Sequence, residues 1–204
     1  MIDFIAIDAP LDCPEEPPKE LKRFLSYSGR TNFRQWVKFP DQEPHLNLPS
    51  DSVFGLEETV AYLVDILKVQ GPFDGVMCFS QGGIIFRHFH RITQEIDRQS
   101  FQHPADSSKQ VFEMPKFMIT VASPVFDMQF HYKGEYYRQR MTPQFNFPSI
   151  HLHGTEDKFS NQLNIHELFE EQANAQVVEY DAGHRFPRKL TDDGFNKLKH
   201  FVQT

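Results

Sequence analysis

The stretch that decides the fold reads GPFDGVMCFSQGG and occupies residues 71–83. Its apolar segment Gly75–Phe79 predicts a short strand, Ser80 follows at once, and an amphipathic helical pattern extends through Ile85–Ile96. This order predicts a nucleophile elbow, in which a serine occupies a strained turn between a strand and a helix and exposes its hydroxyl above the sheet. Ser80 is therefore the candidate nucleophile.

The residues beside Ser80 leave a second interpretation open. A nucleophile elbow needs small residues two positions before and two positions after the serine, because the tight turn brings them against neighbouring backbone. Gly82 meets this requirement, whereas Cys78 replaces the usual first glycine and makes the motif less specific. The same residues fit a simpler structure in which Ser80 only caps the helix at Gln81. A cysteine hydrolase built on Cys78 is disfavoured, because that side chain should point away from a base that faces Ser80.

Outward from this stretch, short apolar runs alternate with amphipathic helical patterns. The alternation predicts an α/β fold, a single domain over residues 1–204 with a mostly parallel sheet flanked by helices. Strands are predicted at Ile2–Ile7, Gly75–Phe79, Phe117–Ala122, Ser149–His153 and Gln176–Tyr180. Helices are predicted at Leu56–Leu67, Ile85–Ile96, Ile165–Phe169 (with Ser160 as its N-cap) and Phe195–Val202. Long irregular loops that overhang the strand ends are predicted at Asp12–Phe54 and Pro124–Pro148.

The composition excludes several classes of protein. The chain has 204 residues, is 39% hydrophobic and carries a formal net charge of −7. This apolar content is too high for a disordered chain, and the length fits one domain. No run approaches the roughly 18 apolar residues of a membrane span. The negative balance and the lack of a long basic run argue against nucleic acid or an anionic membrane as the main partner.

The cysteines and the N-terminal residues bear on the compartment. Cys13 and Cys78 are too few for a disulfide framework, and the first residues lack the basic region of a signal peptide. These features predict a reduced, cytoplasmic protein. The 21 phenylalanines are interpreted mainly as core, with an apolar substrate pocket as the alternative. No feature of the sequence predicts an oligomeric state.

A serine nucleophile needs a base, and the base needs an acid that orients it. In α/β folds with a nucleophile elbow the chain order is serine, then acid, then histidine. Asp157 lies just past the strand predicted at Ser149–His153, and His184 lies just past the one predicted at Gln176–Tyr180. These positions make Asp157 the candidate acid and His184 the candidate base.

Neighbouring residues compete for the role of acid. Glu156 has a longer side chain that suits a contact with solvent, so Asp157 is preferred. Asp181 lies too near His184 in the sequence to be the obvious orienting acid, yet it stays an alternative. Gly183 is expected to let the loop bend so that the imidazole faces the serine.

Other polar clusters have simpler interpretations. Two histidine pairs have alternate spacing, His88 with His90 and His151 with His153. The second pair would suit a metal only if a third ligand existed, and none is evident, so no metal is expected. A small basic cluster surrounds Pro187 and consists of Arg185, Arg188 and Lys189. It is interpreted as a solvated face.

With these residues in place, the chain resembles the family of serine hydrolases that includes the ovarian-tumour-suppressor-like and fungal esterases, within the α/β-hydrolase superfamily. The matching pieces are Ile7–Pro10, Gly55–Thr59, Gly71–Gly75, Phe79–Gly82, Pro148–Asp157 and Gly183–His184. The resemblance implies an esterase or thioesterase of class EC 3.1 that forms an acyl-enzyme on Ser80, with Asp157 as acid and His184 as base. It also implies that no metal or organic cofactor is needed.

The resemblance extends to the substrate site. The backbone N–H of Gln81 is expected to form part of the oxyanion hole. Trp36, in the first long loop, recurs in the family, and we assign it with Phe126 of the second loop to substrate binding. The phenylalanines of these loops suggest a small-molecule ester or thioester substrate with an acyl chain of moderate length.

The chain departs from the family at its beginning. Family members open with an extra apolar strand and a His-Gly type of turn, whereas here Met1 stands almost at the segment Ile7–Pro10. The extra strand would lie between the strands that end at Ala9 and Phe79, and its turn would supply the second oxyanion N–H. Three interpretations stay open: an incomplete chain, direct pairing of the flanking strands, or a weakened or inactive hydrolase-like binding protein.

Overall fold

The structure is a computed structural model that describes residues 3–14, 16, 33–42, 52–102, 112–124, 128–139, 147–158 and 174–203. The chain divides into two compact units. The first unit contains Met1–Leu63 and Met128–Gln139, and the second contains Val64–Asp127 and Arg140–Thr204. The single domain predicted over residues 1–204 stays a prediction.

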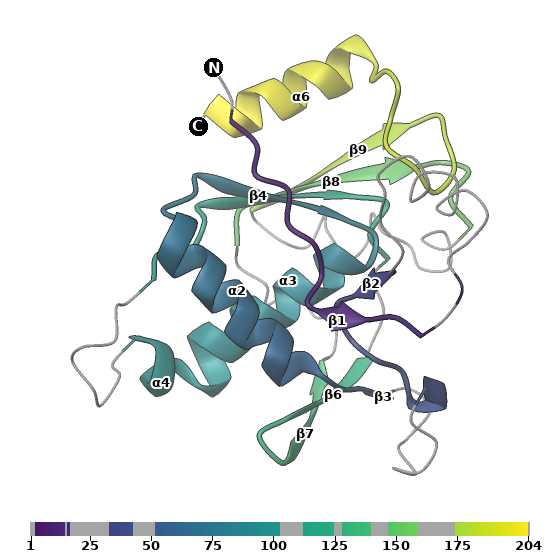
Figure 1. Cartoon of the computed structure of the whole chain (residues 1–204). Coiled ribbons are helices and arrows are strands. Elements are labelled where there is room, and N and C mark those ends of the chain that lie inside the picture. The colour runs from purple at the N-terminus through teal and green to yellow at the C-terminus, as the bar shows by residue number, and fades with distance from the viewer. Residues whose placement is uncertain are drawn as a thin grey trace. The chain divides into compact units, whose positions relative to one another are not determined.

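The second unit is built on a parallel four-stranded sheet (Figure 1). Its strands, in spatial order, are β4 (Gly75–Phe79), β5 (Phe117–Val121), β8 (Ser149–Gly154) and β9 (Ala175–Tyr180). Every neighbouring pair is parallel, so the carboxyl ends of all four strands lie at one edge. The sequence predicted these four strands, and the structure confirms them together with the α/β class.

Burial along the strands follows their positions in the sheet. All six residues of β8 are buried, and so are four of the five residues of β5, as expected for central strands covered on both faces. The outer strands β4 and β9 mix buried and exposed positions. Apolar sequence alone does not separate the centre from the edges, because the central strand β8 (SIHLHG) buries Ser149, His151 and His153, whereas the edge strand β4 (GVMCF) carries no charged or hydroxyl side chain.

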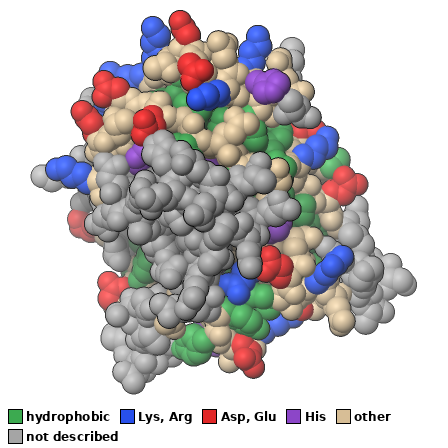
Figure 2. All heavy atoms as spheres, turned by 180° about the vertical axis from the view of Figure 1, so that it is seen from behind, with side chains coloured by type: hydrophobic (Ala, Val, Ile, Leu, Met, Phe, Trp, Pro, Cys, Tyr) green, Lys and Arg blue, Asp and Glu red, His purple; other side chains and the backbone are tan. Residues whose placement is uncertain are grey.

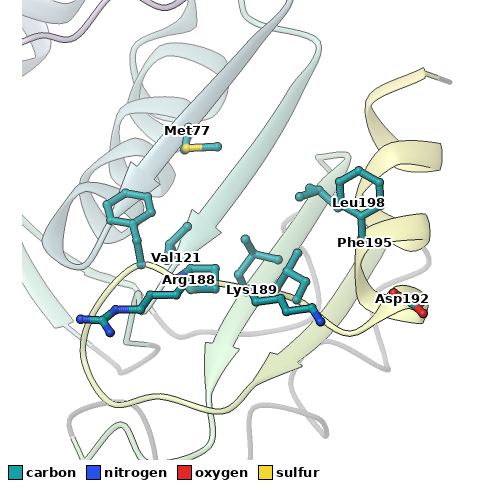
Figure 3. Close-up of a pocket in the computed structure, with 11 residues that line it drawn as sticks. Met77, Val121, Arg188, Lys189, Asp192, Phe195 and Leu198 are labelled. Atoms are coloured by element: carbon teal, nitrogen blue, oxygen red, sulfur yellow. The ribbon is translucent and has the colours of Figure 1, made fainter.

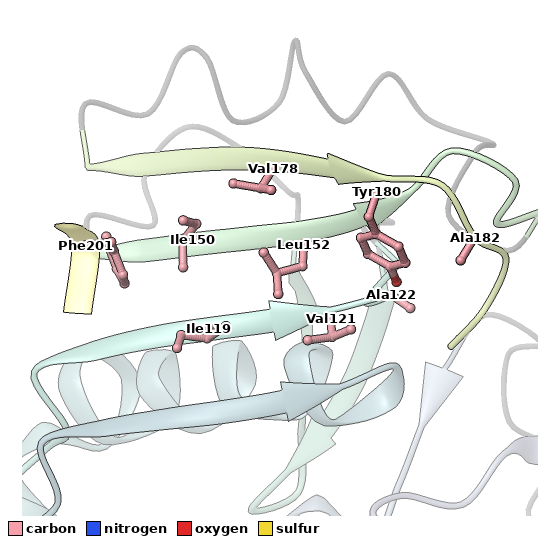
Figure 4. Packing of buried hydrophobic residues seen from close by; sticks show 9 residues of the cluster. All are labelled: Ile119, Val121, Ala122, Ile150, Leu152, Val178, Tyr180, Ala182 and Phe201. Carbon is pink, nitrogen blue, oxygen red and sulfur yellow. The ribbon is translucent and has the colours of Figure 1, made fainter. Parts of the chain in front are cut away.

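Helices cover both faces of this sheet. Helix α6 (Asp192–Gln203) lies over one face, and helix α3 (Gln81–Arg91), continued by the π-helix η3 (Ile92–Ile96), lies over the other (Figure 1). The core on the α6 face is drawn in Figure 4, where Phe201 of α6 reaches the strand residues. Its other members are Ile119, Val121, Ala122, Ile150, Leu152, Val178, Tyr180 and Ala182. The helical patterns at Ile85–Ile96 and Phe195–Val202 are confirmed.

Helix α3 approaches the sheet closely at Gly83. A β-carbon on Gly83 would lie 2.2 Å from Oγ and 2.8 Å from Cβ of Ser123, which is buried. A β-carbon on Gly82 would meet only Cβ of Cys78, at an ordinary 3.7 Å. The glycine that lets the helix pack against the sheet is therefore Gly83, whereas the sequence analysis emphasised Gly82.

Replacing Gly83 with alanine is expected to destabilise the protein by about 1–3 kcal/mol, because the added methyl group overpacks a buried contact. Gly82→Ala is the matched control, and its effect should stay within about 1 kcal/mol because the space is open and alanine favours a helix. Urea unfolding of both variants measures the difference. Equal stabilities would contradict the packing described for Gly83.

The first unit contains a three-stranded sheet, a two-stranded ribbon and the start of helix α2. The sheet has the order β3 (Ser52–Val53), β6 (Met128–Tyr132) and β7 (Glu135–Gln139). The ribbon pairs β1 (Leu11–Asp12) with β2 (Arg34–Gln35), and the 3₁₀ helix η1 spans Pro40–Gln42. Helix α2 (Leu56–Gln70) confirms the pattern read at Leu56–Leu67.

Two sequence predictions are wrong in this unit. A strand was predicted at Ile2–Ile7 from its apolar residues, but residues 3–9 form no strand. Phe4 and Ile5 are 74% and 55% exposed, so this apolar run does not pack into a sheet. The segment Pro124–Pro148 is not irregular throughout, because β6 and β7 form an antiparallel hairpin. Its turn holds Lys133 and Gly134 at φ 50° and 82°, the left-handed conformation of a tight hairpin turn.

Two further helices concern the sequence predictions. The helix predicted at Ile165–Phe169 with its N-cap Ser160 lies outside the described residues, and a short helix α4 (Arg98–Gln102) was not predicted.

In the described part of the chain, no helix combines the length and apolar character needed to cross a bilayer. On the face shown in Figure 2, acidic and basic side chains of the described residues are interspersed. The absence of a nucleic-acid partner stays a prediction.

Candidate active site

Ser80 occupies a strained turn between β4 and α3. Its backbone has φ 49° and ψ −118°, a conformation that costs a residue with a β-carbon about 1–3 kcal/mol. The Ser80 N–H donates to the Val121 carbonyl at 3.0 Å, which ties the turn to the end of the neighbouring strand. The Ser80 side chain makes no capping hydrogen bond to α3, so the simpler interpretation of Ser80 as a helix cap is wrong.

Three side chains from distant parts of the second unit form a hydrogen-bonded chain. Oγ of Ser80 lies 2.8 Å from Nε2 of His184, and Nδ1 of His184 lies 2.9 Å from Oδ2 of Asp157. An ionised carboxylate only accepts hydrogen bonds, so Nδ1 carries the proton that points to Asp157. Nε2 of the neutral ring is then an acceptor for the Ser80 hydroxyl. The structure thus brings together the three candidate residues named from the sequence.

The two adjacent acids in the loop after β8, Glu156 and Asp157, lie in different environments. Asp157 is fully buried, whereas Glu156 is exposed to solvent. The N–H of Asp157 donates to the Gly154 carbonyl at 3.0 Å, and the N–H of Glu156 donates to the Ala182 carbonyl at 3.1 Å. These bonds turn the Asp157 carboxylate toward His184 and leave the Glu156 side chain outside. Asp181, the other alternative, is also exposed.

Tyr180 holds the loop that carries His184, a role that sequence reasoning missed. The Tyr180 hydroxyl donates to the Arg185 carbonyl at 2.6 Å, across the bend that contains His184. Burial, followed by the neighbouring Asp157 carboxylate, raises the pKa of Tyr180 to about 12, so the phenol stays protonated as a donor. From sequence alone, a tyrosine at the end of a strand is interpreted as a core residue. The hydrogen bond from Tyr180 to the Arg185 carbonyl could therefore not be predicted.

A close approach at Gly154 also shapes this loop. A β-carbon on Gly154 would lie 2.4 Å from the Ala182 carbonyl oxygen and 2.8 Å from that of Gly183. Gly183 itself does not adopt the left-handed conformation, which the described glycines show only at Gly55 and Gly134. The Arg185 N–H donates to the Gly183 carbonyl at 2.8 Å and closes the turn at His184, so the expected role of Gly183 in this bend stays a prediction.

The remaining candidates have different outcomes. Gln81 is the first residue of α3 and follows Ser80 directly, and its proposed place in the oxyanion hole stays a prediction. Trp36 lies in the first unit, where its ring contacts that of Tyr62 at a centroid distance of 6.4 Å. Phe126 lies outside the described residues. The substrate-binding roles of Trp36 and Phe126 stay predictions.

Cys78 is buried on β4, and burial raises the pKa of its thiol to about 12. At pH 8 only about 10⁻⁴ of such a thiol is the reactive thiolate. This property disfavours Cys78 as the nucleophile of a cysteine hydrolase.

Iodoacetamide at pH 8 is expected to alkylate Cys13, which is partly exposed, and to leave Cys78 unmodified until the protein unfolds. Peptide mapping by mass spectrometry, with a urea-unfolded sample as control, measures both sites. Rapid alkylation of Cys78 in the folded protein would contradict the burial described.

In the second histidine pair, two hydroxyl groups hold the ring of His151. Nδ1 of His151 lies 2.7 Å from Oγ1 of Thr120, and Nε2 of His151 lies 3.0 Å from Oγ of Ser149. Burial holds the pKa of His151 well below its usual value, so the ring is neutral. Within the residues that the structure describes, no cluster of three or more His, Cys, Asp or Glu side chains has a metal-binding arrangement.

Comparison with known proteins identifies the class. The family described as "Serine hydrolase (FSH1)" matches residues 1–194, and the chain belongs to this family. The resemblance inferred from sequence is thereby confirmed, and the parallel sheet with helices on both faces is an α/β-hydrolase fold.

Individual relatives are similar at low identity. Esterase OVCA2 of Danio rerio is 26% identical over 164 residues, which cover 78% of this chain and 63% of the relative. Esterase OVCA2 of Homo sapiens is 25% identical over 191 residues, covering 91% and 76% respectively. Esterase citA of Monascus ruber is 25% identical over 191 residues, covering 81% and 68%. The chain thus spans less than two thirds of the length of the Danio rerio relative.

Proposed function

We propose that this chain is a serine hydrolase that cleaves carboxylic ester or thioester bonds through an acyl-enzyme on Ser80. The observation that carries the proposal is the chain of hydrogen bonds from Ser80 through His184 to Asp157, at 2.8 and 2.9 Å. Membership of the serine hydrolase family and the esterase names of the relatives support it.

The first half of the reaction forms the acyl-enzyme. His184 accepts the Ser80 proton on Nε2 as Oγ attacks the substrate carbonyl, and Asp157 stabilises the imidazolium that results. The tetrahedral intermediate places a negative charge on the former carbonyl oxygen. The Gln81 N–H, at the positive end of α3, is suited to donate a hydrogen bond to that oxygen. His184 then gives its proton to the departing alcohol or thiol.

The second half releases the acid. A water molecule gives a proton to Nε2 of His184 and attacks the acyl carbonyl, and the proton returns to Ser80 as the carboxylic acid leaves. The ring of Phe79 packs against the His184 ring at a centroid distance of 5.3 Å and limits the positions of the imidazole. These steps use only side chains and backbone of this chain, together with water.

A fluorophosphonate probe tests the proposal, because it reacts only with a serine that is activated by its base. Labelling of the folded protein on the peptide that contains Ser80, and its loss in Ser80→Ala, is the expected result. A well-folded protein that the probe does not label would instead favour an inactive, hydrolase-like binding protein. Parallel rates on ester and thioester substrates with the same acyl group then distinguish the two bond types.

A further inference from the structure

Two phenylalanines stand beside the residues that exchange a proton in the proposed reaction. Phe79 is the last residue of β4 and precedes Ser80, and Phe186 follows His184 by two positions in the segment between β9 and α6. A contact between these two rings therefore joins the strand end that carries the candidate nucleophile to the loop that carries the candidate base.

The two phenylalanine rings and the imidazole follow one another in an aromatic series. The Phe186 ring stacks on the Phe79 ring at a centroid distance of 4.9 Å and an interplanar angle of 17°. The Phe79 ring in turn packs against the His184 ring at 5.3 Å and 54°. Both distances lie in the range of favourable aromatic pairs. The series therefore ends on the imidazole whose Nε2 lies 2.8 Å from Oγ of Ser80.

The hydrogen bonds around His184 fix its loop and one edge of its ring. The Tyr180 hydroxyl holds the backbone carbonyl of Arg185 at 2.6 Å, and Oδ2 of Asp157 holds Nδ1 of the imidazole at 2.9 Å. A hydrogen bond at one ring nitrogen still allows the ring to tilt. The His184 side chain is 27% exposed, so the protein does not enclose the imidazole on every side. The Phe79 ring packs against the imidazole and opposes such a tilt.

Phe186 also lines an apolar groove of about 490 Å³. Met77 and Val121 line it from the strands, and Phe195 and Leu198 line it from α6 (Figure 3). Phe186 is 50% exposed, so packing in the groove leaves about half of its surface free. Within the residues that the structure describes, the Phe186 ring contacts no aromatic ring other than that of Phe79. The stack is therefore the contact through which Phe186 can act on the site.

We propose that Phe186 is a positioning residue, which holds the Phe79 ring against His184 and so keeps Nε2 aligned with the Ser80 hydroxyl. The inference rests on the proposed function. Without the Phe186 ring, one face of Phe79 loses its partner and the imidazole gains room to tilt. A small misalignment slows the attack of Ser80, because proton transfer and bond formation need the reacting atoms in one geometry. Substrate affinity does not depend on this alignment.

The first test removes the ring and then restores it. Phe186→Ala should lower kcat on a p-nitrophenyl ester by about tenfold and leave KM within about twofold of wild type, the pattern of a lost alignment in the transition state. The rate constant of fluorophosphonate labelling should fall by about the same factor, because the probe depends on the same proton transfer. Phe186→Tyr keeps a ring that can stack, so its kcat should stay within about twofold of wild type.

Phe195→Ala is the matched control. Phe195 is also a phenylalanine of the groove and is 57% exposed, but it lies on α6 and belongs to no described ring contact with Phe79 or His184. Its kcat and KM should both stay within about twofold of wild type. Equal losses in Phe195→Ala and Phe186→Ala, or a rise of KM without a fall of kcat in Phe186→Ala, would overturn the inference.

A double-mutant cycle tests whether Phe186 acts through Phe79. In the background of Phe79→Leu, which removes the middle ring, Phe186→Ala should lower kcat by less than a further twofold or so. The full tenfold loss in both backgrounds would overturn the inference. Urea unfolding of each variant verifies the fold. If Phe186→Ala does not fold, Phe186→Leu takes its place in the cycle, because it keeps an apolar side chain and removes the ring.

The outcomes separate this inference from the proposed function. A folded wild-type protein that hydrolyses no ester and is not labelled on Ser80 would refute both. A wild-type protein that is labelled and hydrolyses the ester, together with a folded Phe186→Ala whose kcat and labelling rate equal those of wild type, would refute the positioning role and leave the serine hydrolase proposal standing.

Discussion

Replacing Ser80 with alanine is expected to lower kcat on an activated ester by about 10⁶-fold, the scale of loss when a serine hydrolase loses its nucleophile. Alanine removes the oxygen that lies 2.8 Å from Nε2 of His184, and with it the covalent step. Initial rates with p-nitrophenyl esters measure the effect, and the uncatalysed rate sets the lower limit.

The fold should tolerate this change. Alanine has the same β-carbon as serine at φ 49°, so the backbone strain is unaltered, and the free energy of unfolding should change by less than about 1 kcal/mol. Urea unfolding provides this control. A folded Ser80→Ala protein with activity within about tenfold of wild type would rule out Ser80 as the nucleophile.

Replacing Asp157 with asparagine is expected to lower kcat by about 10⁴-fold. An asparagine amide can present its N–H₂ group to Nδ1 of His184, which favours the ring tautomer whose Nε2 carries the proton. That nitrogen then cannot accept the proton of the Ser80 hydroxyl. The substitution keeps the shape of a side chain that is fully buried, so the loss should appear in kcat rather than in folding.

Glu156→Gln is the matched control, because Glu156 is the adjacent acid and its side chain is exposed. Its kcat should stay within about twofold of wild type, since an exposed charge contributes little. Steady-state rates of the two variants, with circular dichroism to verify folding, decide the matter. If Glu156→Gln lost the activity and Asp157→Asn kept it, the assignment of the acid would be reversed.

The central sheet and the three site residues were predictable because their signals are local. Strands β4 and β5 are short, mainly apolar runs, and β8 and β9 are short segments in which apolar and polar residues are mixed. Ser80, Asp157 and His184 each lie just past the end of one of these strands. Parallel strands bring these ends to one edge of the sheet, so positions far apart in sequence become neighbours. A pattern along the chain was therefore enough to predict which side chains meet.

The features that sequence reasoning missed depend on tertiary contacts. The need for glycine at Gly83 and Gly154 comes from Ser123 and from the Ala182 carbonyl, which approach from other segments. The Tyr180 bond to the Arg185 carbonyl depends on how the loop folds back. The apolar run at Ile2–Ile7 resembled a strand, yet Phe4 and Ile5 are exposed. Such contacts leave no periodic signal in the chain.

The most direct measurement of the central claim is mass spectrometry of protein quenched in acid during turnover of an activated ester. The proposed mechanism predicts a covalent acyl group on the peptide that contains Ser80, appearing at the rate of the first burst of product and absent from Ser80→Ala. An acyl group found on another residue, or turnover with no acyl-protein at any quench time, would contradict it.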